Sequence, residues 1–138
     1  MSPSAAARPT VSVALCTHNG QPFVVDQVQS ILDQSVAAVE IVLSDDASTD
    51  DTVAAVRKLL HDHHAEQGIA IPKLVILQNE YALGVTANFE QAANACSGDL
   101  VALCDQDDRW SPDRLEEITS QFRARPTLTL LHHDARLV

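Results

Sequence analysis

Short apolar runs alternate along the chain with longer segments in which apolar residues recur every three or four positions. Four of the runs are rich in β-prone side chains and lead into polar residues: Thr10–Cys16, Glu40–Leu43, Lys73–Leu77 and Leu100–Cys104. Runs of this length and composition are typical of buried strands. Leu128–Leu131 has the same character, and we predict a fifth strand there.

A helix is predicted after each of the first four strands, because the apolar residues there repeat at helical spacing. The repeating residues are Val24, Val28 and Ile31; Val53, Val56 and Leu60; Phe89, Ala92 and Cys96; and Leu115, Ile118 and Phe122. Ser48 or Thr49 is expected to cap the second helix, and Ser111-Pro112 to open the fourth. We expect the second helix to dissolve in the histidine-rich stretch 61–64.

Strand and helix therefore alternate four times, which predicts an α/β fold: a Rossmann-like three-layer α/β/α sandwich with a mainly parallel sheet. The 138 residues suit one domain. We expect it to span residues 11–138, after a disordered tail at 1–10. No apolar run approaches the ~20 residues that a membrane-spanning helix needs, and we find no signal peptide. These features predict a protein of the cytoplasm or of the inner face of the membrane.

Acidic residues outnumber basic ones by 19 to 9, so the formal net charge is −10. We expect no nucleic-acid partner for such a chain, because phosphate contacts need Lys and Arg. A phosphorylated ligand would need a cation to mediate its binding. The cysteines Cys16, Cys96 and Cys104 are odd in number and include no Cys-x-x-Cys pair, which predicts neither a disulfide framework nor a zinc site.

Three polar clusters, at 17–20, 45–50 and 105–108, each follow a predicted strand. Because the carboxyl ends of parallel strands share one edge, the clusters should converge where doubly wound sheets bind ligands. Crowded carboxylates must take up protons or share a cation. Asp105 and Asp107 offer hard oxygen ligands, which suit Mg²⁺ or Mn²⁺ completed by phosphate oxygens and water.

Other polar residues carry less weight as ligands. His61, His63 and His64 fit a solvated helix end better than a metal cluster. His132 and His133 are adjacent, so on a strand they would point to opposite faces, and we assign them no ligand role.

Two interpretations stay open for three further residues. His18 either touches the ligand or is a simple loop residue, and Trp110 either packs under its loop or stacks on a ligand. Asn88 either lies at the site or only makes local hydrogen bonds.

Five segments together resemble the N-terminal region of inverting family-two glycosyltransferases of the GT-A fold, and look closest to the rhamnosyltransferase-like branch. They are VSVALCTHNG (11–20), SILDQS (30–35), EIVLSDDASTDDT (40–52), NEYALGVTANFEQAANACSGD (79–99) and LCDQDDRWSPDRL (103–115). Their order and spacing match the family over nearly the whole chain after residue 10.

The resemblance implies roles for individual residues. The implied nucleotide-binding residues are Cys16, Thr17, Asn19, Asp45, Asp46, Asn88 and Asp105. Asp46 matches the residue that hydrogen-bonds the pyrimidine ring N–H, with Asp45 as its support. Asp105 and Asp107 correspond to the metal-binding Asp-x-Asp motif, with Asp107 as the preferred ligand of Mg²⁺ or Mn²⁺. Asp108 is implied to contact the metal or the donor sugar.

The implied reaction is metal-assisted transfer of a sugar from dTDP-rhamnose or a UDP-sugar to a polysaccharide or lipid-linked acceptor, with inversion. Peripheral membrane association is implied for the full-length protein. The family's general base is expected beyond Val138, so the chain alone should bind nucleotide and metal without turnover. Asp134 matches the next acidic segment of the family but not that base. Cys16 departs from the pattern, since many relatives carry Thr or Ala there.

Three other functions share some of these features. A non-catalytic nucleotide-binding module would differ only in lacking the base. A phospho-receiver domain would carry its aspartates after the first and third strands and a Lys after the fifth. A sugar nucleotidyltransferase would begin with a Gly-rich, basic loop after the first strand, which the segment at 16–22 (CTHNGQP) is not.

Overall fold

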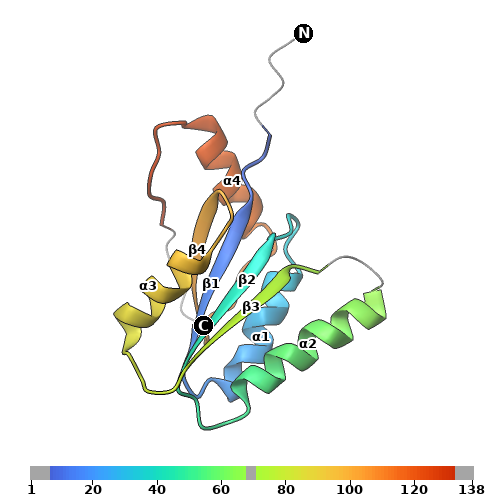
Figure 1. Ribbon diagram of the computed structural model, residues 1–138. Coiled ribbons are helices and arrows are strands. Elements are labelled where there is room, and N and C mark those ends of the chain that lie inside the picture. The colour runs from blue at the N-terminus through green and yellow to red at the C-terminus, as the bar shows by residue number, and fades with distance from the viewer. Residues whose placement is uncertain (1–6, 68–70, 133–138) are drawn as a thin grey trace.

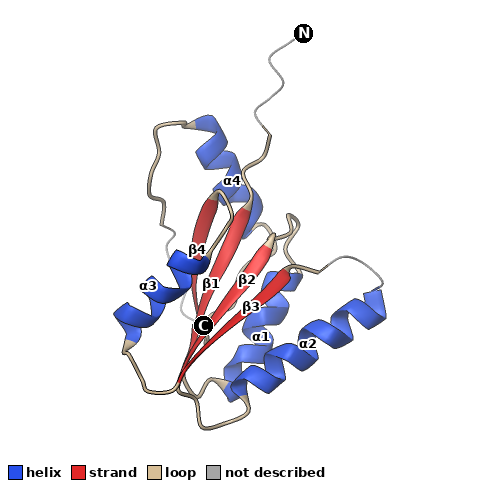
Figure 2. Cartoon of the chain, viewed as in Figure 1, coloured by secondary structure: helices blue, strands red, loops and turns tan. Residues whose placement is uncertain are grey.

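The computed structural model describes residues 7–67 and 71–132 (Figure 2). Its helices and strands alternate as the hydrophobic pattern predicts. In order they are β1 (Val11–Thr17), α1 (Gln21–Leu32), β2 (Glu40–Asp46), α2 (Thr52–Gln67), β3 (Lys73–Asn79), α3 (Val85–Ala95), β4 (Leu100–Asp105) and α4 (Arg114–Ala124).

The four strands form one parallel sheet in the order β3-β2-β1-β4. Helices α1 and α2 cover one face of the sheet and α3 lies on the other, so the predicted three-layer α/β fold is confirmed (Figure 1). The chain moves outward from β1 through β2 to β3 and then returns to place β4 on the other side of β1. This reversal is a topological switch point, and open α/β sheets bind ligands beyond the carboxyl ends of the strands there. The order also differs from the 2-1-3-4-5 order of phospho-receiver domains.

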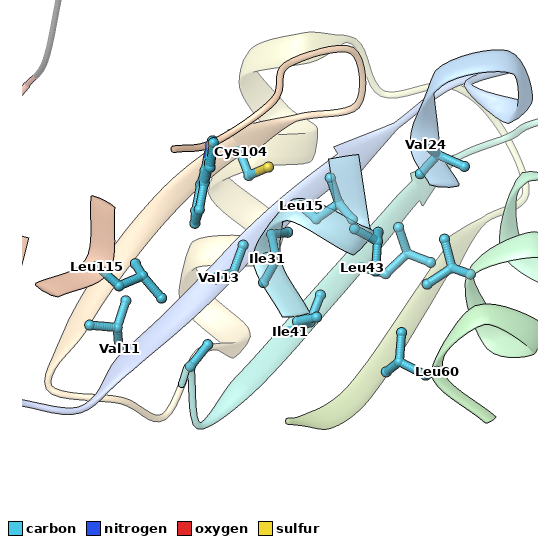
Figure 3. Packing of buried hydrophobic residues seen from close by; sticks show 14 residues of the cluster. Val11, Val13, Leu15, Val24, Ile31, Ile41, Leu43, Leu60, Cys104 and Leu115 are labelled. Atoms are coloured by element: carbon cyan, nitrogen blue, oxygen red, sulfur yellow. The ribbon is translucent and has the colours of Figure 1, made fainter. Parts of the chain in front are cut away.

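The two faces of β1 bury different kinds of side chain. Val11, Val13 and Leu15 point into a large core shared with α1, α2 and α4 (Figure 3). Ala14 and Cys16 point the other way, toward a smaller cluster with Ala92 of α3. The alternation follows from the two-residue period of a strand, and every residue of β1 is buried because both faces are covered.

Strand β2 extends three residues beyond the predicted Leu43 and includes Ser44, Asp45 and Asp46. All three are buried, and their backbones pair with β3 through Leu77, Gln78 and Asn79. The sequence prediction ended the strand at the first polar residue. Buried polar side chains are stable when hydrogen-bonded, and partners from other loops supply those bonds here.

Two other predictions are wrong. Helix α2 does not dissolve at 61–64 but continues to Gln67, because its polar residues lie on an exposed face and Lys58 pairs with Asp62 at 2.6 Å. Leu128–Leu131 forms no strand. Apolar residues alone do not make one, because a strand needs a neighbour for its backbone groups, and Leu130 is 78% exposed.

The chain before β1 is described from residue 7, so most of the predicted tail lies outside the described residues. Thr10 is nonetheless tied to the turn before β4. Its N–H donates to Asp99 Oδ2 at 2.9 Å, and its Oγ1 accepts the Asp99 N–H at 2.9 Å. Among the described helices, none combines the length and apolar character that crossing a bilayer requires.

A buried carboxylate joins three elements at the amino edge of the sheet, away from the polar clusters. Glu40 is 3% exposed, and its Oε1 accepts the hydroxyls of Ser12 at 2.7 Å and of Ser97 at 2.9 Å. It also accepts the Ser97 N–H. The bond from Ser12 contributes most to holding the pKa of Glu40 below its ordinary value, followed by the bond from the Ser97 backbone. Glu40 therefore stabilises the junction of β1, β2 and the turn before β4.

Replacing Glu40 by glutamine should lower the free energy of unfolding at pH 7 by about 1–2 kcal/mol, because the hydrogen bonds lose their charged acceptor. A carboxylate whose pKa is lowered in the folded state contributes its full stability above its unfolded pKa of ~4.3. That contribution is lost as the pH falls through the folded pKa. The difference between wild type and Glu40→Gln should therefore shrink on acidification. Urea unfolding at pH 7 and at several acidic pH values tests this. Glu90→Gln, at an exposed position, is the control, and its difference from wild type in free energy of unfolding should stay near zero.

Candidate functional site

The predicted polar clusters meet at the carboxyl edge of the sheet. Cys16 of β1 lies opposite Asp105 of β4, and Thr17 lies opposite Asp45 of β2. The ends of all four strands point to the same lower edge of the molecule in Figure 1. The convergence inferred from strand order is therefore present, and it falls at the switch point between β1 and β4.

Cys16 is the next-to-last residue of β1 and is 6% exposed. Burial above all, and then the nearby charges of Asp105 and Asp46, raise the pKa of its thiol to about 12. The thiol is therefore protonated at neutral pH and is no nucleophile. All three cysteines are free.

Asp45 acts as a tie between β1 and the loop after β2. Its Oδ1 accepts the hydroxyl of Thr17 at 2.6 Å and that of Ser48 at 2.5 Å, and its Oδ2 accepts the Ser48 N–H at 3.1 Å. Thr17 and Asp45 are both buried. These bonds fix the floor of the site, and a part of Asp45 in nucleotide binding stays a prediction.

Asn19 ties the loop that follows β1 (the β1 loop, residues 18–20) to the loop before α2. Its backbone N–H donates to Ser48 Oγ at 2.8 Å, and its side-chain oxygen accepts the Thr49 N–H at 2.7 Å. Asn19 adopts a left-handed backbone conformation with φ 48, which asparagine tolerates better than most residues. Asp50, rather than Ser48 or Thr49, accepts the N–H of Thr52 at the start of α2.

Ala47 also adopts the left-handed conformation, with φ 58. An L-residue with a Cβ pays about 1–2 kcal/mol for it, whereas glycine does not. Ala47→Gly should therefore raise the free energy of unfolding by about 1 kcal/mol. Urea unfolding measures the change. Ala54→Gly on the exposed face of α2 is the matched control and should lower stability by about 1 kcal/mol.

Asp46 is 5% exposed at the end of β2. Its Oδ1 accepts the N–H of Leu83 at 2.7 Å and an amide hydrogen of Asn79 at 2.9 Å, and its Oδ2 accepts the N–H of Gly84 at 2.9 Å. Burial alone would raise the pKa of Asp46, but these bonds outweigh it and hold the pKa below its ordinary value. Asp46 is therefore an ionised acceptor, and three of about four lone-pair positions on its carboxylate are in use.

Asn88, at 3% exposed, belongs to a buried network rather than to an open surface. Its Oδ1 accepts the hydroxyl of Ser44 at 2.6 Å, and its Nδ2 donates to the Ser44 carbonyl at 2.9 Å. Gln91 extends the network by donating to Ser44 Oγ at 3.0 Å and to Asn79 Oδ1 at 2.9 Å. The described bonds give Asn88 a supporting position beneath Asp46, and its contact with a nucleotide stays a prediction.

Asp105 is the exposed last residue of β4, and Asp107 and Asp108 lie on the exposed loop that follows it. Partial burial, then the charges of Asp107 and Asp105, raise the pKa of the Asp108 carboxyl, while Arg114 lowers it. Three carboxyl groups thus crowd into a short tract, and the Arg114 guanidinium does not cancel the rise in the pKa of Asp108. A bound cation would relieve this repulsion, so the tract is electrostatically suited to one.

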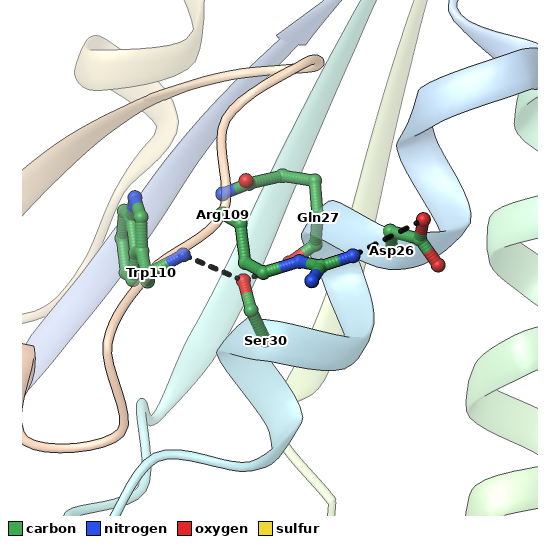
Figure 4. Close-up of polar contacts among 5 residues, drawn as sticks. All are labelled: Asp26, Gln27, Ser30, Arg109 and Trp110. Carbon is green, nitrogen blue, oxygen red and sulfur yellow. Dashed lines mark hydrogen bonds and ion pairs between the residues drawn. The ribbon is translucent and has the colours of Figure 1, made fainter. Parts of the chain in front are cut away.

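The tract is anchored where it returns to the protein body (Figure 4). Trp110 is 4% exposed, and its backbone N–H donates to Ser30 Oγ of α1 at 3.1 Å. Arg109 pairs with Asp26 of α1 at 3.4 Å, an exposed contact worth little by itself. The packing interpretation of Trp110 is confirmed, and its ring also lies 4.8 Å from the Arg114 guanidinium.

Gln27 and Gln106 are two site residues that sequence reasoning missed. Gln27 of α1 is fully buried and donates to Cys104 Sγ at 2.6 Å beneath the tract. Gln106 bonds His18, whose ring Nδ1 lies 2.5 Å from the Asp46 carbonyl oxygen. The one sequence signal for Gln106 was its place between two aspartates.

Within residues 7–67 and 71–132, no group of three or more His, Cys, Asp or Glu side chains is arranged to hold a metal ion. This includes His61, His63 and His64. Asp105 and Asp107 would thus have to share a cation with a ligand's phosphate oxygens. Mg²⁺ is commonly bound in that way, through one or two carboxylates.

A sequence model of the protein family glycosyl transferase family 2 matches residues 12–136 of the chain. Chondroitin synthase of Escherichia coli is 30% identical over 93% of the chain, and the match covers 17% of that protein. The putative teichuronic acid biosynthesis glycosyltransferase TuaG of Bacillus subtilis is 33% identical over 80% of the chain and is covered to 40%. The chain thus spans well under half the length of these curated relatives.

Two solved structures share the fold. S. aureus TarS 1–349 in complex with UDP superposes with a TM-score of 0.72 at 22% identity, covering 85% of this chain and 33% of the TarS 1–349 chain. The mannosyltransferase PcManGT of Pyrobaculum calidifontis, in complex with GDP-Man and Mn²⁺, gives a TM-score of 0.73 at 25% identity. That comparison covers 90% of this chain and 35% of PcManGT.

Proposed function

Because the chain belongs to glycosyl transferase family 2, we propose that it supplies the donor- and metal-binding site of an inverting glycosyltransferase. The proposed donor is a pyrimidine nucleoside diphosphate sugar, either dTDP-rhamnose or a UDP-sugar. The sugar passes to a hydroxyl of a polysaccharide or lipid-linked acceptor. The single observation that carries the proposal is that the β1 loop, Asp46 and the Asp105–Asp108 tract meet at one edge of the sheet.

Asp46 supports recognition of the base. Its carboxylate is held ionised and has one lone-pair position to spare after the bonds from Asn79, Leu83 and Gly84. An ionised carboxylate accepts the ring N–H that uracil, thymine and guanine offer, whereas adenine and cytosine present an unprotonated ring nitrogen at the equivalent edge. Uracil and thymine are the smaller rings and are the ones we assign to the floor formed by Cys16 and Thr17.

Asp107 and Asp105 are the residues that we assign to Mg²⁺ or Mn²⁺, with Asp107 as the direct ligand. The cation would act as a Lewis acid that stabilises the leaving diphosphate. Partial burial contributes most to the raised pKa of Asp108, and the charges of Asp107 and Asp105 contribute next; this crowding of charges is the observation in favour of a cation here. The complex of PcManGT with GDP-Man and Mn²⁺ is consistent with this assignment.

The acceptor half of the reaction rests on the relatives. The names of two of them refer to synthesis of chondroitin and of teichuronic acid, which are both sugar polymers. Transfer to a hydroxyl also needs a base to remove its proton, and we assign that base to no described residue. A non-catalytic nucleotide-binding module is the alternative, and sugar transfer from a nucleotide donor to an acceptor would exclude it.

Calorimetric titration with UDP, dTDP, GDP and ADP, each in Mn²⁺ and in EDTA, tests the proposal. We expect UDP or dTDP to bind in Mn²⁺ at least about tenfold more tightly than ADP, because one hydrogen bond to a charged acceptor is worth about 1.5–3 kcal/mol. EDTA should weaken the binding of every diphosphate. Equal affinity for ADP and UDP, or no effect of Mn²⁺, would count against the assigned site.

A further inference from the structure

The side-chain amide of Gln106 pairs with the backbone of His18 through two hydrogen bonds. Its Oε1 accepts the His18 N–H at 2.7 Å, and its Nε2 donates to the His18 carbonyl at 3.0 Å. A primary amide that uses both its donor and its acceptor on one residue is held in a single orientation. In the described part of the chain, these are the only side-chain hydrogen bonds that join residues 17–20 to residues 106–108.

Gly20 makes room for this pairing. A Cβ built on Gly20 would lie 2.3 Å from Gln106 Oε1 and 2.7 Å from its Cδ. The backbone of Gly20 has φ −95, which any residue can adopt. The space that the Gln106 amide occupies, rather than backbone strain, is therefore what disfavours a side chain at this position.

The pairing spans the switch point between β1 and β4. On one side, the β1 loop is already fixed to β2 and α2 through Asn19 and through the bond from the Gly20 N–H to Thr52 Oγ1 at 3.0 Å. On the other side, Gln106 is flanked by Asp105 at the end of β4 and by Asp107 on the exposed loop that follows. The tract is held at Asp105 by the pairing of β4 with β1 and at Trp110 by α1, and between these points Gln106 is the described side chain that bonds it to the β1 loop.

We propose that Gln106 is a positioning residue that couples metal binding at Asp107 to nucleotide binding at the β1 loop. The inference rests on the proposed function. With Gln106 paired to His18, a cation bound to the acidic tract and a nucleotide base bound at the β1 loop can belong to one nucleoside diphosphate complex. Without the pairing, each half still binds its own ligand, but Asp107 is held less closely at its distance from the β1 loop.

The test compares UDP affinity in Mn²⁺ and in EDTA for wild type, Gln106→Ala, Gly20→Ala and the double variant. The readout is the ratio of the two dissociation constants. We expect this ratio to fall about tenfold in Gln106→Ala, the equivalent of about 1.4 kcal/mol, while the affinity in EDTA stays within about twofold. Gly20→Ala should have a similar effect because its Cβ displaces the same amide. The double variant should then be no worse than either single one, since both remove one interaction.

Gln121→Ala, on the exposed surface of α4, is the matched control and should leave the ratio unchanged. A wild-type protein whose UDP affinity ignores Mn²⁺ would overturn the proposed function and the inference with it. A wild type with strong coupling and a Gln106→Ala variant with equal coupling would overturn the inference alone. If Gln106→Ala lowers the affinity for UDP in EDTA as much as in Mn²⁺, the inference is also overturned. That result would show that Gln106 supports nucleotide binding at the β1 loop and does not couple it to the metal.

Discussion

Replacing Trp110 by alanine is expected to lower the free energy of unfolding by about 3–5 kcal/mol, the usual cost of removing a large buried aromatic side chain. Trp110 is 4% exposed and packs in the main core with Leu115 and Cys104. The variant also loses the contact of the ring with the Arg114 guanidinium. Because the whole stability of a domain is about 5–15 kcal/mol, this one change removes a large share of it.

Urea unfolding followed by circular dichroism measures the effect, since the variant lacks the chain's one tryptophan and its fluorescence. Trp110→Phe keeps an aromatic ring in the core and should cost less than half as much, so it remains measurable if Trp110→Ala does not fold. Arg109→Ala is the matched control, because its ion pair with Asp26 is exposed. A loss below about 1.5 kcal/mol in Trp110→Ala would show that the loop is not anchored through this ring.

Asp107→Ala should reduce the Mn²⁺-dependent affinity for UDP by more than about 100-fold, because even an outer-shell partner of a metal ligand is worth about 10- to 100-fold. The variant should not be less stable than wild type. Asp107 is exposed and adds to the charge that raises the pKa of Asp108. Removing that charge lowers the pKa of Asp108 and relieves repulsion in the tract. Loss of binding with unchanged or slightly raised stability is typical of residues kept for function.

Calorimetry in Mn²⁺ and in EDTA measures the binding, and urea unfolding measures the stability. Asp113→Ala is the matched control, since Asp113 is an exposed aspartate just beyond the tract whose side chain makes no cap hydrogen bond at the start of α4. It should bind UDP as wild type does. If Asp113→Ala and Asp107→Ala weaken UDP binding equally, the loss comes from the change in net charge, and Asp107 is not a specific metal ligand.

The convergence of the polar clusters could be inferred from sequence because it follows from chain order alone. Each cluster follows a strand, and parallel strands end at one edge. The helical repeat of apolar residues predicted the four helices that the structure describes, and the short apolar runs predicted its four strands. The family assignment was also within reach, because the motifs around Asp46 and Asp107 lie at a characteristic order and spacing.

Hydrogen-bond partners distant in the chain could not be read in the same way. Gln106 and His18 are 88 residues apart in the chain, and nothing in the sequence indicates that these two residues contact each other. The burial of Glu40 likewise depends on Ser12 and Ser97, which only the folded sheet brings to it. A glutamine or glutamate is by default a surface residue, so its sequence position alone argues against a structural role.

The end of β2 shows a related limit of hydrophobic pattern. Ser44, Asp45 and Asp46 read as a loop because polar residues usually end a buried strand. In the structure their side chains are bonded by Asn88, Thr17 and the backbone of Gly84. Leu128–Leu131 shows the reverse case, since apolar character predicted a strand where no strand among the described residues pairs with the backbone. In both cases tertiary contacts outweighed local preference.

The position of a bound Mn²⁺ tests the central claim most directly. Paramagnetic broadening of backbone amide signals, recorded as Mn²⁺ is added to the protein with UDP, reports which residues lie near the ion. We predict that the signals of residues 105–108 and 17–20 broaden first, and that those of His61, His63 and His64 on α2 persist. Broadening centred on these histidines, with the 105–108 signals unaffected, would contradict a metal and nucleotide site at the carboxyl edge of the sheet.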